Sequence, residues 1–393
     1  MLAKEGGLRH NAPMRDLIQS RVLPNIDWFL VLSAFAICIL GLFTMRPVSD
    51  VDPFFTRQLI WIGIGVLVFF CASIPSYSFL RRTPIVVGLY SFTLALLALI
   101  FILGAVVKGA QQRFDLGLFA LQPSDPAKLI LIVVLSKYFA RRHVEIGHLR
   151  HILVSGAYAG AIGALVFLQP DLGGAIIIMA IWLGMVLVAG ISWKHLATLF
   201  LIGLICAVGL WGFVLEDYQK DRILTFLHPL ADIQGAGYNA YQSTVAVGSG
   251  ELFGKGIGFG TQSKLRFLPE YQTDFIFAAF AEEWGFIGVL LLLSLYALVV
   301  TRTLAIASRG SDNFAVLFGS GVSILFLAHI IIHIGMNMGL LPVTGTTIPF
   351  MSYGGSHLVT EFAALGILMG LRRRSRSAVS VEDRTDLVGS AYS

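Results

Sequence analysis

Apolar runs long enough to cross a lipid bilayer recur along the whole chain, and they constrain its fold more than any other feature. A hydrocarbon core about 30 Å thick is crossed by roughly 20 apolar helical residues. Backbone polar groups find no water in lipid, so spanning segments must be helices or closed barrels. We therefore predict an all-α integral membrane protein with about ten transmembrane helices, at residues 27–45, 58–75, 84–107, 125–140, 152–168, 172–191, 196–215, 275–300, 314–336 and 354–371.

The composition agrees with a membrane protein and excludes several other classes. Hydrophobic residues make up 56% of the chain and charged residues 13%, whereas soluble domains average about 45–50% and 25%. The net charge of +5 comes from Lys and Arg in short loops and at the C-terminus, so no basic domain for nucleic acid is present. Cys38, Cys71 and Cys206 all lie in apolar runs, which gives no disulfide framework.

The distribution of Lys and Arg predicts the orientation of the spans. Positive residues before the first span, in every second loop and after the last span would all lie on the same side of the membrane. They are Arg9, Arg15, Arg21, Arg81, Arg82, Lys137, Arg141, Arg142, Arg150, Lys194, Arg302, Arg309, Arg372, Arg373, Arg374 and Arg376. By the positive-inside rule, both termini are cytoplasmic. The first span is too long for a signal-peptide core and has no small-residue cleavage site after it.

The chain then divides into a cytoplasmic N-terminal segment (1–26), one membrane domain (27–371) and a polar cytoplasmic tail (372–393) expected to be disordered. One long extracytoplasmic loop, 216–274, separates the seventh and eighth spans. Its first part, LEDYQKDRILTFLHPL, alternates apolar and charged residues as an interfacial helix does. Its glycines match neither a Walker A loop nor GxGxxG, which favours an outer loop packed on the bundle.

Two pairs of polar residues stand at the outer mouths of spans. Asp125 and Lys128, in LQPSDPAK, are three residues apart and can share a helical face. They form either a local ion pair at a helix N-terminus or a substrate contact. Gln169 and Asp171, in FLQPDLGG, precede the sixth span, where Asp171 is slightly favoured as a helix cap over a functional group.

Other polar residues lie deeper in the spans. Glu282 and Glu283 are adjacent, so one of them is expected to point into the bundle and hold a basic partner such as Lys128 or Arg222. His329 and His333 are at i and i+4, but the pattern has no HExxH glutamate and no third ligand at a regular spacing. Ordinary bundle histidines are therefore favoured there over a metal site.

Asp274 lies in LPEYQTDFIF, at the outer mouth of the eighth span and one helical turn after Glu270. A carboxylate at the boundary between water and an apolar environment can have a pKa raised toward the range of a general base. An Asp followed by an apolar run is also a helix-start signal. From the residues alone, a helix cap is favoured over catalysis.

Five strings spread along most of the chain together resemble the SEDS family (shape, elongation, division and sporulation proteins). They are QPSDPAK, QPDLGGA, GAGYNAYQSTVAVGSGELFGKG, GTQSKLRFLPEYQTDFIFAAFAEEWGFIG and GLLPVTGTTIPFMSYGGS, and they follow the family order from about Lys108 to the tail. Within the family, GTQSKLRFLPE and PVTG are more similar to the elongation protein RodA than to the division protein FtsW.

The resemblance implies a peptidoglycan glycosyltransferase that polymerises lipid II for cell elongation and rod shape. The family's essential aspartate falls on Asp274. The 4-hydroxyl of an acceptor GlcNAc would attack C1 of a donor MurNAc with inversion and release undecaprenyl pyrophosphate, with Asp274 as the base. The candidate substrate contacts are Lys128, Asp125, Arg222, Lys108, Arg113, Gln169, Asp171 and Gln262. No cofactor is certain, although a divalent cation (Mg or Mn) could share the leaving-group charge.

The resemblance also implies a location and partners. The protein would lie in the bacterial cytoplasmic (inner) membrane with its active site on the outer face. It would work with a class B penicillin-binding protein, a transpeptidase, within the elongation machinery. Two alternatives from other classes remain: a lipid II flippase, and a scaffold that only positions a transpeptidase. A division-type polymerase is a third alternative, within the same family.

Several positions depart from the family pattern. Asp125 stands where the family usually has Glu, and GAQQRF replaces GAQRW, which moves the arginine to Arg113. Gln272 replaces a common histidine, His333 stands in place of an asparagine, and TGTTIP replaces TGIPLP. These changes indicate a divergent member and leave Asp274 unaffected.

Overall fold

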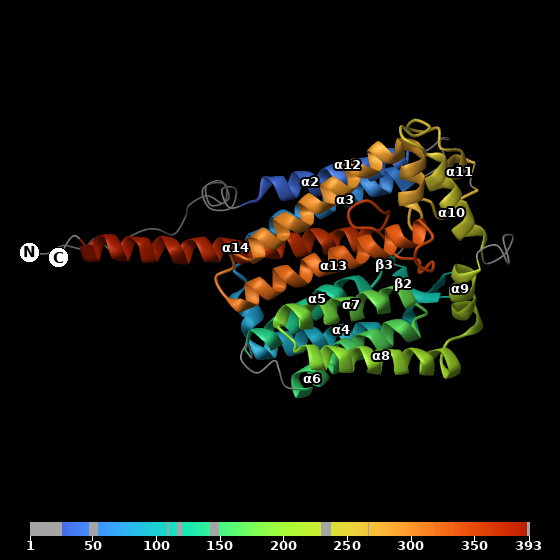
Figure 1. Ribbon diagram of the computed structural model, residues 1–393. Coiled ribbons are helices and arrows are strands. Elements are labelled where there is room, and N and C mark those ends of the chain that lie inside the picture. Colours follow the sequence, from blue (N-terminus) through green and yellow to red (C-terminus); the bar gives the residue numbers. More distant parts are fainter. Residues whose placement is uncertain are drawn as a thin grey trace, which may run out of the picture.

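The computed structural model describes residues 26–46, 54–107, 110–115, 120–141, 149–228, 237–265 and 267–390 as a bundle of long helices (Figure 1). The long helices are α2 (Trp28–Thr44), α3 (Phe54–Ser73), α4 (Thr83–Leu103), α5 (Ser124–Ala140), α6 (Leu149–Leu168), α7 (Leu172–Ala189), α8 (Trp193–Phe213), α12 (Ile276–Ala307), α13 (Asn313–Asn337) and α14 (Gly355–Ser390). Each lies at an expected span, so the all-α membrane architecture is confirmed.

Length and hydropathy single out seven of these described helices as able to cross a membrane: α3, α4, α6, α7, α8, α12 and α13. Helix α2 is apolar but has only 17 residues. Helices α5 and α14 occupy the two remaining expected positions and carry buried charged side chains. The count of ten spans therefore stays a prediction.

Several boundaries differ from the sequence-based expectation by a few residues, and α12 continues to Ala307 instead of ending near residue 300. Helix α4 ends at Leu103, and residues 105–107 form a strand instead of the last turn of the span. Helix α14 continues to Ser390 and extends beyond the bundle in Figure 1, where a disordered tail from 372 was expected.

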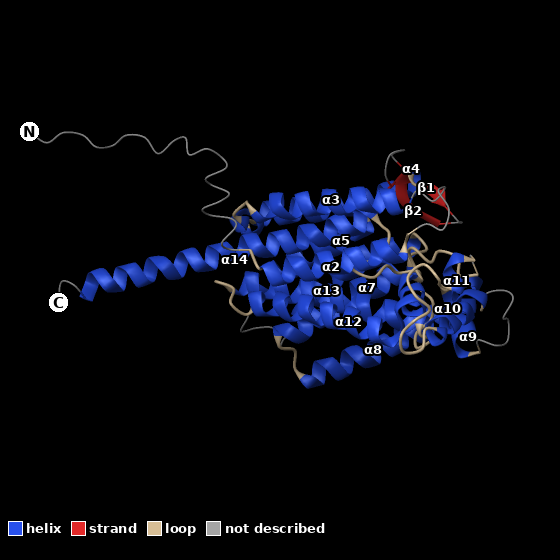
Figure 2. Cartoon of the chain, turned by 90° about the horizontal axis from the view of Figure 1, so that it is seen from above, coloured by secondary structure: helices blue, strands red, loops and turns tan. Residues whose placement is uncertain are grey.

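The end of the bundle opposite the termini carries the irregular structure (Figure 2). Three short antiparallel strands, β1 (Ala105–Val107), β2 (Ala110–Asp115) and β3 (Ala120–Leu121), pair in the order β1-β2-β3. Register partners include Val106 with Gln111 and Phe114 with Leu121. The same end carries the helices of the long loop, α9 (Asp217–Leu227), α10 (Tyr238–Ser249) and α11 (Thr261–Lys264). Helix α9 confirms the helix expected at LEDYQKDRILTFLHPL.

The opposite end is held together by an ion-pair cluster. Asp27 caps α2 by accepting a hydrogen bond from the Leu30 amide at 3.2 Å. Its carboxylate also binds Arg302 of α12 at 2.6 Å and Arg372 of α14 at 3.2 Å. A short 3₁₀ helix, η3 (Tyr77–Arg81), contributes an ion pair between Arg81 and Asp312. Three helices from distant parts of the sequence are thus joined where the termini leave the bundle.

Helix α12 is interrupted near the start of its span. Gly285 has φ 65° and ψ −167°, a backbone conformation that residues other than glycine rarely adopt. The loop after α10 packs into this kink, where the amides of Phe286 and Ile287 donate to the carbonyls of Glu251 and Leu252. A Cβ on Gly254 would collide with the backbone of Glu283. The glycine-rich loop is therefore packed on the bundle, as expected from its sequence.

Candidate active site

The buried ion pair Asp125–Lys128 forms one side of the candidate site. Asp125 lies in the first turn of α5, and its Oδ1 is 3.2 Å from Lys128 Nζ. Both side chains are buried among helices α5, α13 and α14. The local ion pair expected from the spacing is confirmed. Burial of both charges, however, requires further partners, because an incompletely paired ion in an apolar interior is costly.

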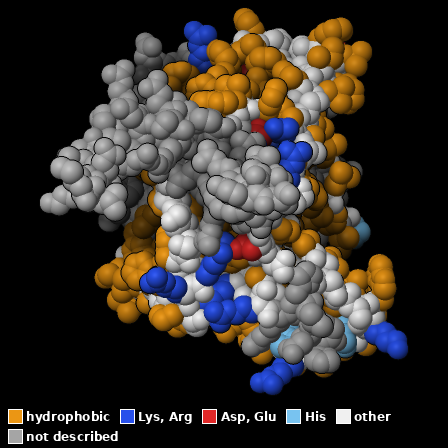
Figure 3. All heavy atoms as spheres, turned by 90° about the vertical axis from the view of Figure 1, so that its left-hand side faces the viewer, with side chains coloured by type: hydrophobic (Ala, Val, Ile, Leu, Met, Phe, Trp, Pro, Cys, Tyr) orange, Lys and Arg blue, Asp and Glu red, His pale blue; other side chains and the backbone are white. Residues whose placement is uncertain are grey.

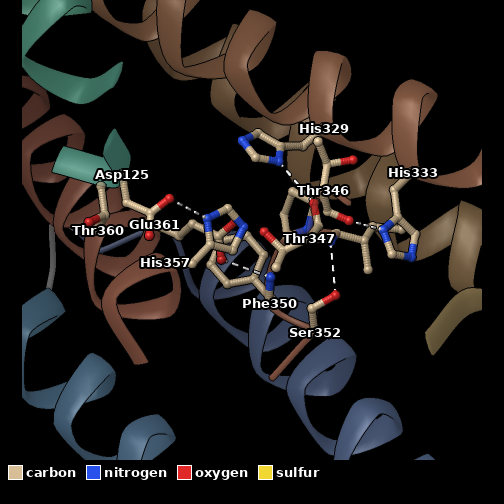
Figure 4. A network of polar contacts seen from close by, with 12 residues as sticks. Asp125, His329, His333, Thr346, Thr347, Phe350, Ser352, His357, Thr360 and Glu361 are labelled. Carbon is tan, nitrogen blue, oxygen red and sulfur yellow. Dashed lines mark hydrogen bonds and ion pairs between the residues drawn. The ribbon is translucent and has the colours of Figure 1, made fainter. Parts of the chain in front are cut away.

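Those partners come from two other helices (Figure 4). His357 of α14 lies between two carboxylates, with Nδ1 3.5 Å from Asp125 Oδ1 and Nε2 2.8 Å from Glu361 Oε1. With His357 protonated, the four groups carry two positive and two negative charges. On the other side, His329 Nε2 of α13 is 3.5 Å from Lys128 Nζ. Charge balance explains how this cluster is accommodated inside the bundle.

The tautomer of His329 follows from its second contact. Its Nδ1 is 2.9 Å from the carbonyl oxygen of Thr347, so Nδ1 carries the hydrogen. In a neutral ring Nε2 is then an acceptor, which suits the ammonium of Lys128. His333, one turn along α13, likewise directs Nδ1 at the carbonyl of Thr346, at 2.6 Å. The described residues contain no group of three potential metal ligands, and both histidines serve to bind the backbone.

The segment 338–354, between α13 and α14, is held by side chains from several elements. Glu361 Oε2 accepts a hydrogen bond from the amide of Phe350 at 2.8 Å. Phe350 has φ 61°, an unusual conformation for a bulky residue. The Ser352 hydroxyl donates to the carbonyl of Thr273 at 2.9 Å, and the Tyr353 amide donates to that of Gln272 at 2.8 Å. The segment is thereby fastened to the turn that carries Asp274.

Asp274 lies in the turn before α12 and is partly buried. The N-cap of α12 is Phe275, so Asp274 is not the helix cap that the sequence favoured. A Cβ placed on Gly345 would be 3.4 Å from Asp274 Oδ2. Gly345 has φ 68°, and it therefore lets the 338–354 segment approach the carboxylate closely.

The same segment connects Asp274 with the start of α7. Thr346 contacts Gly173 so closely that a Cβ on this glycine would collide with its methyl group. Asp171 caps α7 by accepting a hydrogen bond from the Gly174 amide at 2.7 Å, which confirms the capping interpretation. Burial raises the pKa of the Asp171 carboxyl, the attraction of Lys128 opposes this increase, and the repulsion of Asp125 adds to it. The two motifs QPSDPAK and QPDLGG thus meet beside the 338–354 segment.

The other expected substrate contacts are less closely grouped. Gln169 is buried and donates from Nε2 to the carbonyl of Leu97 in α4 at 2.8 Å, a contact between helices. Arg113 is exposed on β2, and Arg222 is partly exposed on α9. Gln262 is the second residue of α11, and Lys108 lies outside the described residues. Arg113, Arg222 and Gln262 belong to the end of the bundle that carries the irregular structure, and Gln169 lies at the same end, two residues before the α7 cap Asp171.

The basic partner of Glu282 differs from both residues expected. Glu282 Oε1 binds Lys255 Nζ at 2.7 Å and also accepts hydrogen bonds from the Thr261 hydroxyl and the Gln262 amide, at 2.9 and 3.1 Å. Glu282 pairs with Lys255 instead of Lys128 or Arg222, because the kink at Gly285 brings the glycine-rich loop, and Lys255 with it, over the N-terminal part of α12. This contact fixes the loop that precedes Asp274.

Sequence reasoning missed three residues of the site: His357, Glu361 and Asn337. His357 and Glu361 stand at i and i+4 inside the last apolar run, and ionisable residues at membrane depth are a signal that could have identified them. Asn337 ends α13 and is fully buried. Its Nδ2 donates to the carbonyl of Asp274, a contact that no spacing in the sequence indicates.

Comparisons with protein families, known proteins and solved structures all point to the same protein family. A family model for FtsW, RodA and SpoVE, described as cell cycle protein, matches residues 24–377. Peptidoglycan glycosyltransferase MrdB of Escherichia coli (strain K12) is 35% identical over 349 residues, which cover 88% of this chain and 93% of that protein.

Two solved structures are similar over most of their length. The rod shape determining protein RodA of Thermus thermophilus is 30% identical, with a TM-score of 0.67, over 88% of this chain and 96% of that one. A second structure, described as "Structural coordination of polymerization and crosslinking by a peptidoglycan synthase complex", is 31% identical, with a TM-score of 0.76, over 89% and 98% of the two chains.

Proposed function

Because the chain belongs to the FtsW, RodA and SpoVE family of cell cycle proteins and is a multi-pass membrane peptidoglycan glycosyltransferase, we propose that it polymerises lipid II into glycan strands with Asp274 as the catalytic base. One observation carries this proposal. The Asp274 carboxylate lies against Gly345, in a segment that also contacts the start of α7 and is bound by the Asp125–Lys128 network. One carboxylate and a buried cation are thus connected through the 338–354 segment.

The reaction needs a base, a nucleophile and stabilisation of a leaving group. Asp274 would take the proton from the 4-hydroxyl of the acceptor GlcNAc as this oxygen attacks C1 of the donor MurNAc. The C1–O bond to pyrophosphate breaks, C1 is inverted, and undecaprenyl pyrophosphate leaves with the electron pair.

The leaving pyrophosphate requires positive charge at a place shielded from water. Arg222 and Arg113 are the accessible cations among the proposed contacts that the structure describes. Lys128 lies deeper, with Asp125 and His329 facing two of its three N–H donors. Its ammonium group would stabilise the negative charge of the leaving pyrophosphate from the buried side of the site. A low dielectric there strengthens the attraction between the two charges. A divalent cation that shares this role is part of the proposal.

We assign the active site to the outer face of the bacterial cytoplasmic membrane. Lys and Arg side chains are exposed on the opposite end of the bundle, where α2 begins and α14 extends beyond the other helices (Figure 3), and the positive-inside rule makes that end cytoplasmic. The similarity to MrdB and RodA supports a role in cell elongation. The description of the synthase complex, which names polymerization and crosslinking together, supports a class B penicillin-binding protein as partner.

The test is polymerisation of labelled lipid II by the full chain together with its cognate penicillin-binding protein. Wild type should give a ladder of glycan lengths, and Asp274→Asn should slow its formation by about a hundredfold or more, the usual contribution of a general base. Glu270→Gln, in the same turn, is the matched control and should polymerise normally. Equal ladders from Asp274→Asn and wild type would remove Asp274 from the chemistry. Lipid II that crosses liposomes without polymerising would favour a flippase.

A further inference from the structure

A cavity with a largely apolar lining and two positively charged side chains, Lys137 and Arg141, lies at the other end of the bundle from Asp274. It is formed between the first turns of α4, the last turns of α5 and the middle of α6, and its volume is about 170 Å³. One water molecule needs only about 10–15 Å³ measured in the same way, so the cavity has room for a larger group. Helix α5 connects the two sites, with Asp125 in its first turn and Lys137 in its last turn.

Lys137 is the main reason to assign a ligand to this cavity. Its side chain is covered by the protein, with only 8% of the residue exposed, and it lines the cavity. Within the described part of the chain, its Nζ has no hydrogen-bond partner. A lysine near a membrane surface normally extends its ammonium group into water. A covered ammonium without an acceptor is costly, and an anion in the cavity would remove that cost.

The other lining groups also favour an anion. Arg141 follows Lys137 by one helical turn on the same face of α5, so the two positive charges repel each other when no anion is present. None of the nine lining residues, all within the described ranges, is acidic. Thr83 contributes a hydroxyl at the mouth, and the Arg141 guanidinium donates to it at 3.5 Å.

The walls of the cavity are held in place by aromatic residues. The Tyr90 hydroxyl donates to the carbonyl of Tyr158 at 2.9 Å, and their rings pack edge to face at 5.4 Å. The Tyr138 ring packs against Tyr158 at 6.0 Å, and its hydroxyl is 3.0 Å from His151 Nδ1. Contacts between α4, α5 and α6 therefore hold the walls of the cavity in place. Such pre-organised walls lower the cost of binding a ligand.

We propose that this cavity binds a phosphate group, and that the phosphate belongs to the headgroup of an anionic phospholipid from the membrane leaflet at this end. The apolar part of the lining supports a lipid as the source. Val86 and Val134 are buried, whereas Val87 is 55% exposed on the outer surface of α4. An acyl chain that leaves the cavity over Val87 would remain in hydrocarbon, while Lys137 and Arg141 bind the phosphate. This site is separate from the polymerisation chemistry proposed for Asp274.

The experiment measures binding to the full chain in a neutral detergent. Dioctanoyl phosphatidylglycerol, dioctanoyl phosphatidylcholine and inorganic phosphate are titrated separately, and bound ligand is counted by native mass spectrometry. The variants are Lys137→Met and Arg141→Gln. Lys194→Met is the matched control, because Lys194 is an exposed lysine in the first turn of α8 and does not line the cavity.

Phosphatidylglycerol should bind more tightly than phosphatidylcholine, and inorganic phosphate should not displace it. Lys137→Met and Arg141→Gln should each weaken its binding by about tenfold, since a hydrogen bond to a charged group contributes that much. Lys194→Met should bind as wild type does. Displacement by inorganic phosphate would support the phosphate site but overturn a lipid as its source. Equal binding of both lipids, or unchanged affinity in Arg141→Gln and a folded Lys137→Met, would overturn the proposal.

Discussion

Asn337 Nδ2 donates a 3.0 Å hydrogen bond to the backbone carbonyl oxygen of Asp274, across the interface between α13 and the turn that precedes α12. The same nitrogen donates to the carbonyl of His333 at 2.8 Å. Its Oδ1 accepts from the amide of Ala278 at 3.2 Å and from the hydroxyl of Ser243 at 3.3 Å. The single hydrogen of the Ser243 hydroxyl has its shorter contact with the Asn337 backbone carbonyl oxygen, at 2.9 Å. Both N–H donors of the Asn337 amide are used and its oxygen accepts from Ala278, so Asn337 positions the Asp274 backbone.

Replacement of Asn337 by aspartate should therefore slow polymerisation. Asp has the same shape but turns two donors into acceptors that face carbonyl oxygens. The resulting displacement of Asp274 should lower kcat by about ten- to hundredfold, the effect typical of a shift near 1 Å in a catalytic group. Steady-state kinetics with labelled lipid II would measure this effect. Asn313→Asp, at the exposed start of α13, should leave the rate unchanged. A normal kcat in Asn337→Asp would show that the turn does not depend on this amide.

Replacement of Glu361 by leucine should loosen the 338–354 segment. This change removes the acceptor of the Phe350 amide and one of the two carboxylates that face His357. Hydrogen exchange of the Phe350 amide should become about ten- to hundredfold faster, as expected for the loss of about 1–3 kcal/mol of local stability. Thr360→Val, at the preceding residue, is the control. Unchanged exchange in Glu361→Leu would show that other contacts hold the segment.

Replacement of Lys255 by methionine should destabilise the protein without removing a group from the proposed chemistry. Glu282 would keep the Thr261 hydroxyl and the Gln262 amide but lose its cation. Because Lys255 is about a third exposed, we expect a loss of about 1–3 kcal/mol, less than for a fully buried pair. Thermal unfolding in detergent would show a lower Tm. The double variant Lys255→Met with Glu282→Gln should recover part of the loss, and failure to recover any of it would argue against the ion pair.

Asp171 gives a prediction about pH. Burial raises the pKa of its carboxyl above the ordinary value, so the folded protein binds the proton more tightly than the unfolded chain. The contribution of Asp171 to stability should therefore fall as pH rises from the ordinary carboxyl pKa through the raised value. Asp171→Asn keeps a helix cap and lacks this dependence. Unfolding measured across that pH range should show wild type losing stability relative to Asp171→Asn, and parallel curves would contradict the raised pKa.

Removal of divalent cations should slow polymerisation, and added Mg²⁺ or Mn²⁺ should restore it. The described residues contain no cluster of three metal ligands, so we expect the ion to bind together with the substrate pyrophosphate. Calorimetric titration of the substrate-free protein with Mn²⁺ should then show no tight site. Full polymerisation in the presence of a chelator would remove the cation from the proposal.

How well each feature could be predicted depended on whether its physical cause is local in the sequence. Hydropathy over about 20 residues depends only on neighbours in the chain, so a helix lies at every expected span. The cap at Asp171 and the ion pair Asp125–Lys128 were also correct, because their partners lie three residues away. The turn at Asp274 was misjudged as a cap because Phe275 takes that position in the folded chain.

The sequence by itself determined a helical membrane bundle, the end of it that gathers irregular structure, and the position of Asp274 at that end. Only the tertiary structure decided which charges pair. His357 joins Asp125 to Glu361, Lys255 reaches Glu282 over the kink at Gly285, and Asn337 holds the carbonyl of Asp274. Asp125 and His357, Lys255 and Glu282, and Asn337 and Asp274 are separated by tens to hundreds of residues. In a low dielectric a buried charge pairs with whichever opposite charge the packing of the helices brings near. Local patterns in a sequence do not contain that information.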